Sequence, residues 1–330
     1  MILAGDIGGT HARVAIFDLA DGKLTGVHER VYLTHDFPNL ESVVHAFLDQ
    51  HKVAPAAACF GVAGPVIDNH AHMSNAGWAI DGASLAREAG VKQVSVINDL
   101  VANAYGVAAL EPRDFLTLNE GKANLRGNAG VISAGTGLGE AGLYFDGHTR
   151  RPFATEGGHA DFAPADDLQI ELLRFLRAEF DRVSVERVLS GGGIYNIYRF
   201  LRDTHRGEEP PWLAQEMKSG DAAAAITHAA TEKNSPLCAA ALDLFVSIYG
   251  AEAGNLALRL MASGGIYIGG GIAVKIASRL ADPVFMRAFA AKGRMSEIVR
   301  QIPVRVILND STALIGAARA AAINASMLND

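Results

Sequence analysis

The chain has 330 residues, 49% of them hydrophobic, with 35 glycines and a formal net charge of −7. Acidic and basic residues are spread without a run of one sign, which excludes a dedicated surface for nucleic acid or anionic membrane. Two well-separated cysteines, no signal-peptide pattern and no apolar run near the ~20 residues of a membrane span predict a soluble, cytoplasmic protein, and the length favours two domains.

Strands and helices alternate over the first 110 residues. Helical spacing of apolar residues marks the stretches NLESVVHAFLDQHK and LVANAYGVAAL. The expected strands are Met1–Leu3, His11–Asp18, Leu24–Leu33, Ala56–Gly64 and Val94–Ile97. This alternation predicts an α/β domain in which helices cover a sheet.

The pattern restarts after Pro112. Asn128–Gly147 reads as strand, glycine loop and strand, and it echoes the opening GDIGGTHARVAIFDLADG. Gly264–Ile276 reads as strand, glycine turn and helix, and a last strand and helix follow in IPVRVILNDSTALIGAARAAAINA. HRGEEPPWLAQEMKSGD, residues 205–221, reads as a polar surface loop. We expect a duplicated fold with a boundary near residue 110.

Three glycine-rich turns follow apolar strands, at Gly5–Thr10, Gly135–Gly139 and Gly269–Gly271. Glycine lets backbone N–H groups approach an anion without an intervening side chain. One such turn is ordinary in α/β proteins, but three of them with Asp6 and two threonines favour phosphate binding. The GxxxxGK[ST] and GxGxxG nucleotide fingerprints are both missing from the expected places.

Polar residues at strand ends supply further candidates. Asp6 beside the first turn suits Mg²⁺ held largely through water, although a turn aspartate also bonds its own backbone. Asn98 and Asp99 end a strand where α/β proteins bind ligands, although either residue could cap the next helix. We expect one of the two to cap and the other to serve a ligand.

Glu156 and His159, in TEGGHADFAP, carry the groups that a polyhydroxy ligand needs, because each hydroxyl both donates and accepts. Asn75, in SNAGW, offers an amide near an indole. Glu186 lies on a predicted helix, where an exposed glutamate is ordinarily only solvated. No cysteine accompanies His159, which disfavours zinc.

Taken together and in order, these motifs resemble those of the bacterial glucokinases over nearly the whole chain. The matching stretches are GDIGGTHAR, SNAGW, INDL, GTGLG, EGGHADFAP, ERVLSGGG, GGIYIGGGI and NDSTALIGAA. The resemblance implies the hexokinase, actin and chaperone-ATPase superfamily, with two ribonuclease-H-like α/β domains and ATP in the cleft between them. It places residues 1–110 and 303–330 in a small domain and residues 111–302 in a large one.

The resemblance also implies roles for individual residues. Asp99 matches the catalytic base, and Asp6 lies where Mg²⁺ is expected. The implied ATP ligands are Gly5, Asp6, Ile7, Gly8, Gly9, Thr10, Gly135, Thr136, Gly137, Gly269, Gly270 and Gly271. The implied sugar ligands are Asn75, Asn98, Asp99, Glu156, His159 and Glu186. ADFAPADDLQ lacks the cysteine cluster of the related ROK proteins, which indicates the zinc-free type, and His11 replaces the commoner Asn.

The implied activity is ATP-dependent phosphorylation of D-glucose to glucose 6-phosphate, the first step of glycolysis, by a homodimer. Two alternatives stay open. One is a kinase of another hexose or of an N-acetylated amino sugar. The other is a sugar-responsive regulator without catalysis, which Asp99 and the lack of a helix-turn-helix before the first strand disfavour.

Overall fold

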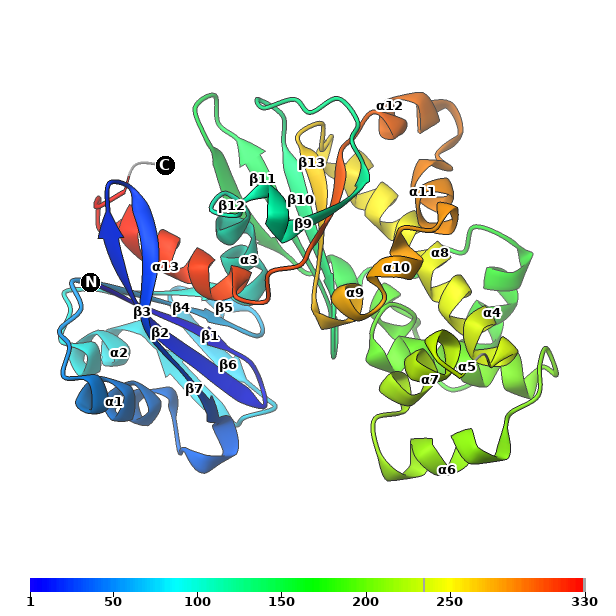
Figure 1. Cartoon of the computed structure of the whole chain (residues 1–330), viewed down its shortest axis with the longest axis horizontal. Coiled ribbons are helices and arrows are strands. Elements are labelled where there is room, and N and C mark those ends of the chain that lie inside the picture. Colours follow the sequence, from blue (N-terminus) through cyan, green and yellow to red (C-terminus); the bar gives the residue numbers. More distant parts are fainter. Residues whose placement is uncertain (234, 329–330) are drawn as a thin grey trace. The chain divides into compact units, whose positions relative to one another are not determined.

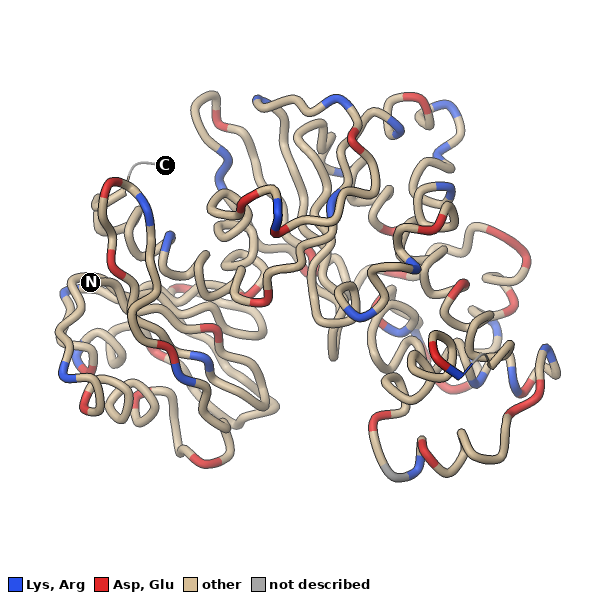
Figure 2. The backbone as a smooth tube through the Cα atoms, viewed as in Figure 1, with Lys and Arg blue, Asp and Glu red and all other residues tan. Residues whose placement is uncertain are grey.

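The structure, a computed structural model, describes residues 1–233 and 235–328 (Figure 1). By their contacts these residues divide into two compact units. Unit 1 holds Met1–Asp114, Asp146–Ala154 and the described residues from Asn309 onward, and unit 2 holds Phe115–Phe145 and the described residues of Thr155–Leu308. Acidic and basic residues are interspersed along the described chain, as the composition predicts (Figure 2).

Unit 1 is built on a five-stranded sheet in the order β3-β2-β1-β4-β8. Neighbours β1, β2 and β3 are antiparallel, while β4 and β8 run parallel to β1. The strands are β1 (Ile2–Ile7), β2 (His11–Ala20), β3 (Lys23–Leu33), β4 (Ala57–Val62) and β8 (Val94–Asn98). The helices are η1 (Thr34–Asp36), α1 (Leu40–His51), α2 (Gly82–Ala89), α3 (Asp99–Val107), η2 (Pro112–Asp114) and α13 (Thr312–Asn324). The expected strands and helices of this half are therefore confirmed.

The alternation of side chains along β1 decides what each face of this sheet packs against. Leu3 and Ile7 belong to the core under α1 and α2, whereas Ile2 and Ala4 belong to the core under α13. Because side chains alternate with a period of two, Asp6 projects from the same face as Ile2 and Ala4. The sequence pattern of β1 thus puts this carboxylate on the side of the sheet that carries α3 and α13.

Helices α3 and α13 pack backbone to backbone through glycines. A Cβ on Gly316 would lie 1.8 Å from the Ala102 carbonyl oxygen, and a Cβ on Gly106 would lie 2.1 Å from the Thr312 carbonyl oxygen. No other residue type fits these two positions without moving a helix. The carboxy-terminal helix is therefore a fixed support for α3, which begins at Asp99.

A second sheet has six strands in the order β12-β11-β10-β13-β14-β9. Pair β10/β11 is antiparallel, and pairs β10/β13 and β13/β14 are parallel, as are the corresponding pairs of the first sheet. The strands are β9 (Phe115–Asn119), β10 (Ala129–Ala134), β11 (Leu138–Phe145), β12 (Arg150–Thr155), β13 (Gly265–Gly269) and β14 (Val304–Ile307). Apart from β9, the second sheet therefore repeats the strand order of the first sheet, which supports the expected duplication.

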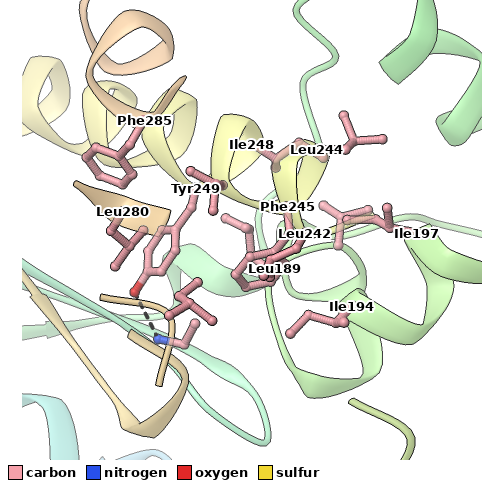
Figure 3. Packing of buried hydrophobic residues seen from close by; sticks show 14 of the residues in the cluster. Leu189, Ile194, Ile197, Leu242, Leu244, Phe245, Ile248, Tyr249, Leu280 and Phe285 are labelled. Atoms are coloured by element: carbon pink, nitrogen blue, oxygen red, sulfur yellow. Dashed lines mark hydrogen bonds between the residues drawn. The ribbon is translucent and has the colours of Figure 1, made fainter. Parts of the chain in front are cut away.

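Most helices of unit 2 surround α8 (Pro236–Leu260), the longest of the described helices. The others are η3 (Gly157–His159), α4 (Asp167–Arg177), η4 (Val185–Arg187), α5 (Gly191–Asp203), α6 (Pro211–Ser219), α7 (Ala222–Thr231), α9 (Gly271–Lys275), α10 (Ala277–Leu280), α11 (Pro283–Ala290), η5 (Gly293–Met295) and α12 (Ser296–Arg300). By length and composition α8 could cross a membrane, contrary to expectation, but 72% of its most apolar stretch is buried among side chains such as Phe285 and Leu280 (Figure 3). It is the core helix of this unit.

Four segments differ from the sequence-based expectation. Residues 205–221 include helix α6 rather than only loop, because Pro211 occupies the first helical position, where proline costs no hydrogen bond. Glu186 lies on the single 3-10 turn η4 instead of a full helix. Residues 304–307, expected with the small domain, form β14 between β13 and β9. A small sheet, β5 (Val66–Ile67), β6 (His70–Met73) and β7 (Trp78–Asp81), was not expected, since its strands are very short.

Candidate active site

The first glycine turn, Gly8–Thr10, closes the antiparallel pair β1/β2. The Gly8 N–H donates to the His11 carbonyl oxygen at 2.9 Å. Thr34 holds the turn from η1, since its hydroxyl donates to the Gly9 carbonyl at 2.7 Å and its N–H donates to the Thr10 carbonyl at 3.0 Å. With its carbonyls fixed from one side, the turn has a defined shape, as a phosphate-binding loop requires.

Asn75 lies against this turn, on the loop between β6 and β7. A Cβ on Gly9 would lie 2.9 Å from the Asn75 Cβ and 3.3 Å from its Nδ2. Gly9 is therefore the residue that lets Asn75 approach, and the Asn75 side chain stays exposed. The structure places Asn75, an expected sugar ligand, next to the first glycine turn.

Asp6 and Asp99 lie at the same end of the first sheet, where the parallel strands β1, β4 and β8 finish. Asp6 is opposite Gly61 in the parallel pair β1/β4, and Gly61 is opposite Ile97 in the pair β4/β8. A Cβ on Gly61 would lie 2.8 Å from the Ala102 Cβ, so this glycine lets the first turn of α3, which begins at Asp99, approach the sheet. Burial raises the pKa of Asp6, and the Arg13 guanidinium across the hairpin opposes that shift.

Asn98 and Asp99 are the last residue of β8 and the first residue of α3. Asn98 is the N-cap of α3: its Oδ1 accepts from the N–H groups of Leu100 (2.9 Å) and Val101 (3.3 Å), and its Nδ2 donates to the Gly64 carbonyl at 3.1 Å. Asp99 is the first residue of the helix, and its carboxylate accepts from Leu100 N–H at 2.9 Å. The carboxylate lies at the positive end of the helix dipole, which attracts negative charge.

The second glycine turn joins β10 to β11 and rests on Glu186. Gly135 N–H donates to the Gly137 carbonyl at 2.9 Å, which closes the turn. Glu186 Oε2 accepts from Leu138 N–H at 3.0 Å, and a Cβ on Gly137 would lie only 2.5 Å from that oxygen. Gly191 N–H reaches the Gly135 carbonyl at 2.9 Å, so the start of α5 is tied to the same turn.

The third glycine turn lies beside the second, because β10 and β13 are parallel neighbours with Ser133 opposite Gly269. Gly270 has φ +88°, and a Cβ on it would lie 2.3 Å from the Ala134 carbonyl oxygen. The Tyr249 hydroxyl accepts from Ala134 N–H at 3.2 Å and contacts the Gly269 carbonyl at 3.3 Å (Figure 3). This buried tyrosine of α8 therefore joins the two strand ends beneath the turns.

A cavity of about 360 Å³ opens above these two turns. It is lined by Gly135, Thr136, Gly191, Gly192, Ile194, Asp221, Ala223, Ala224, Thr227, Gly271, Ile272, Lys275 and Ile276. Helix α5 begins at this cavity, with its Ser190 cap accepting from Gly193 N–H at 3.0 Å. Helices α5 and α7 were not expected at this cavity, although the SGGG stretch before an apolar helical pattern was an available signal.

Glu156 and His159 frame a short turn, η3, with Glu156 Oε2 and His159 Nε2 4.0 Å apart and both side chains more than half exposed. The turn is seated on β11, since a Cβ on Gly158 would lie 2.1 Å from the Leu138 carbonyl oxygen. Val185 N–H donates to the Ala160 carbonyl at 2.9 Å, which connects the turn to η4. The structure thus gathers Glu156, His159 and Glu186 around the first residues of β11.

Beneath this turn lies Glu140, which is not among the residues expected at the site. Its side chain is 1% exposed, and its Oε2 is 3.4 Å from Arg259 Nη1. Burial, followed by the nearby Glu252 carboxylate, raises the pKa of Glu140 to about 7, and Arg259 opposes the rise. Nothing in the local sequence of β11 marks this residue, because Glu252 and Arg259 come from α8.

This raised pKa predicts a pH-dependent stability. Since the folded chain holds the Glu140 proton up to about pH 7 and the unfolded chain only to about pH 4.5, the stabilisation is complete below pH 4.5 and lost as the pH rises through 7. The free energy of unfolding of the parent relative to Glu140→Gln should fall by roughly 2–3 kcal/mol over that range. Urea unfolding at pH 5, 6, 7 and 8 measures this, and a constant difference would refute it.

The family model and the sequence relatives that match this chain carry the same name. A sequence model of the family described as Glucokinase matches residues 3–324. A glucokinase from a Nostoc species is 43% identical over 338 residues, covering 98% of this chain and 99% of that protein. A Caulobacter glucokinase is 37% identical, with 96% and 93% covered.

Solved structures of proteins with the same name share the fold of this chain over nearly its full length. The crystal structure of a glucokinase from an Antarctic psychrotroph superposes with a TM-score of 0.84 at 34% identity, covering 97% of this chain and 98% of that one. At 20% identity and a TM-score of 0.62, a Streptomyces griseus ROK glucokinase solved with glucose and AMPPNP shares the fold over 97% of this chain and 98% of its own. On the family match and the full-length relatives, the chain belongs to the glucokinase family.

Proposed function

We propose that this protein transfers the γ-phosphoryl group of ATP to the 6-hydroxyl of D-glucose. The observation that carries the proposal is the placement of Asp99. Asp99 is the first residue of α3 and lies at the carboxyl ends of the strands of the first sheet, where Asp6 also lies. The whole chain is 43% identical to a glucokinase over almost its full length. A coupled assay of ADP release over a panel of sugars tests the proposal, and it fails if glucose does not promote ADP release.

The adenine nucleotide takes the cavity of unit 2 in this proposal. Apolar walls from Ile194 and Ile272 suit a base, while Asp221 and Lys275 offer polar contacts, a composition typical of small-molecule sites. The capped start of α5 presents the Gly191 and Gly192 backbone, and helix N-termini favour anions. The phosphates then contact the second and third glycine turns, which lie at this cavity. The first glycine turn, in unit 1, is a separate candidate for phosphate binding.

Asp99 is the catalytic base in this mechanism. Phosphoryl transfer depends mainly on positioning and on stabilisation of charge, and a carboxylate that accepts the hydroxyl proton completes the attack. We assign the sugar contacts to Asn98, Asp99, Glu156, His159 and Glu186, with Asn75 beside the first turn. Carboxylate, amide and imidazole groups can pair hydroxyls that both donate and accept.

Asp6 is the proposed residue for Mg²⁺, held largely through water. The fit is chemical: a partly exposed carboxylate at a strand end beside a glycine turn offers the oxygen ligand that Mg²⁺ prefers. When bound, the cation neutralises charge on the transferring phosphate. Among the described residues there is no group of three or more His, Cys, Asp or Glu arranged to hold a metal ion.

Activity is accordingly expected to need Mg²⁺ or Mn²⁺ and not zinc, because the donors offered here are oxygens and lack thiolates. Dialysis against a zinc-selective chelator, followed by Mg²⁺, should leave the rate of glucose phosphorylation at its starting value. A lasting loss that only added zinc restores would contradict the assignment of the zinc-free type.

The remaining proposals concern the setting of the enzyme. We propose that the two units are the ribonuclease-H-like domains of the actin-like ATPase superfamily, supported by the shared strand order of the two sheets. A cytoplasmic location is supported by Cys59 and Cys238, which are free and buried. A homodimer is proposed on the family resemblance alone.

The alternative function is a kinase of another hexose or of an N-acetylated amino sugar. The sugar panel distinguishes it from a glucose kinase.

A further inference from the structure

The Glu140 carboxyl is in direct contact with the turn that carries Glu156 and His159. A Cβ on Gly157 would lie 2.0 Å from Glu140 Oε2 and 2.7 Å from its Cδ. The carboxyl group therefore fills the space beneath Gly157, and only a glycine fits above it. Since Glu140 is 1% exposed, it has no freedom to withdraw toward solvent.

The backbone of the same residue holds the turn a second time. The Thr155 hydroxyl donates to the Glu140 carbonyl oxygen at 3.0 Å, and Gly157 N–H donates to that hydroxyl at 3.2 Å. Glu140 thus supports the turn through its side chain and through a two-step hydrogen-bond chain. A displacement of β11 at this residue moves Glu156 and His159 with it.

Charged groups from two other segments belong to the same buried network as the Glu140 carboxyl. From α8, the Arg259 guanidinium pairs with both Glu140 and the buried Glu252, and the Tyr249 hydroxyl lies in the same core. From the segment after α11, Lys292 Nζ donates to Asn255 Oδ1 at 2.7 Å, and Asn255 Nδ2 donates to Glu252 at 2.9 Å. The turn itself carries Glu156 and His159, whose side chains are both more than half exposed.

One oxygen of this network lacks a partner while both carboxyls are ionised. Glu140 Oε1 is buried and has no hydrogen-bond partner among the described residues. A proton on Glu140 would let its carboxyl donate a hydrogen bond to Glu252. That bond would remove the repulsion between two buried carboxylates and would reduce the cost of burying an unpaired oxygen. Ionisation of Glu140 would set two buried carboxylates against each other directly beneath Gly157 and so strain the support of the turn.

From these contacts we infer that Glu140 is a positioning residue for glucose binding, which holds the Glu156–His159 turn in its binding geometry. The inference rests on the proposed function, which assigns the sugar contacts to this turn. It adds a residue that touches no substrate. It also predicts that glucose affinity weakens as the Glu140 proton is lost.

The first test compares the pH dependence of the glucose KM in the parent and in Glu140→Gln. Glutamine keeps the volume and donates to Glu252 without titrating, so the ratio of the parent KM to the variant KM should rise at least about threefold between pH 6 and pH 8.5. The change should appear in KM rather than in kcat, because the reacting groups are untouched. A ratio that does not vary with pH overturns the coupling to the proton.

Glu209→Gln is the matched control. Glu209 is also a partly buried carboxylate of unit 2 paired with an arginine, Arg202 at 3.1 Å, and it accepts from the Tyr198 hydroxyl at 2.7 Å. It has no contact with the turn in the structure as described. This variant should keep the pH profile of the parent KM.

The second test is a double-mutant cycle between Gly157 and Glu140. Gly157→Ala alone should raise the glucose KM at least about tenfold, since its Cβ collides with the buried carboxyl. Adding Glu140→Ala removes the colliding atoms and leaves the Glu140 Cβ at 3.3 Å, so the double variant should recover part of that loss. Additive effects overturn the positioning role.

The cycle is also measured as free energy of unfolding, which requires no substrate. Recovery of stability in the double variant supports the contact between carboxyl and turn even if the sugar assay fails, and additivity in both readouts refutes it. A parent that phosphorylates no sugar refutes the proposed function instead. The two failures are therefore distinguishable.

Discussion

Asp99→Asn is expected to lower kcat for glucose phosphorylation at least about 10²-fold and to leave the glucose KM within several-fold of the parent. Asparagine has the shape of aspartate, and its side-chain oxygen can keep the hydrogen bond from Leu100 N–H. It cannot accept the proton of the attacking hydroxyl. Steady-state rates of ADP release at saturating ATP and Mg²⁺ give both constants.

Asp18→Asn is the control for this substitution. Asp18 is an exposed carboxylate of β2 in the same unit, and it also accepts from the N–H of the next residue, Leu19, at 3.0 Å. Its amide variant should have the parental kcat. If Asp99→Asn turns over glucose at the parental rate, Asp99 is not the base.

The choice among sugars should follow the pairing of hydroxyl groups. A site built to pair a hydroxyl is left with an unpaired polar group when an analogue lacks it, and rejection can then reach about 10⁴-fold. We expect kcat/KM to be highest for glucose, lower for mannose and 2-deoxyglucose, and lowest for N-acetylglucosamine and galactose. An N-acetyl group at C2 removes a donor and also adds bulk.

Substitutions in unit 2 should weaken this preference. His159→Ala removes the imidazole above β11, and Glu186→Gln removes a charge while its amide oxygen can still accept from Leu138 N–H. Both should reduce the discrimination between glucose and its C2 analogues without changing ATP binding. His228→Ala is the control, because His228 forms the same type of exposed pair, with Glu232 at 3.5 Å. If fructose or N-acetylmannosamine is the best substrate of the parent, the assignment to glucose is wrong.

The parts of the site that could be predicted from sequence are those whose chemistry is local. The glycine turns and the Asn98-Asp99 pair each lie within a few residues of a strand end, so periodicity and turn chemistry mark them. Even there, the sequence does not show which of Asn98 and Asp99 caps the helix. The hydrogen bonds from the N–H groups of Leu100 and Val101 to Asn98 Oδ1 show that Asn98 is the cap.

The parts that could not be predicted depend on contacts between distant segments. Glu140 meets Arg259 across 119 positions of sequence, and Tyr249 reaches Ala134 across 115. Glu140 lies in a strand, LGEAGLYF, where a single glutamate reads as a solvent-facing residue. Only the packing of α8 beneath the second sheet shows that this carboxyl is buried.

The packing of α13 against α3 also constrains how the protein is made. The face of β1 and β4 that carries Ile2, Ala4 and Cys59 packs against α13, whose first residue lies about 200 positions after the end of α3. At roughly 5–20 residues per second of synthesis, this face waits on the order of 10–40 seconds for its partner. During translation the amino-terminal sheet therefore emerges with one apolar side uncovered, and that side stays exposed to aggregation until the last helix arrives.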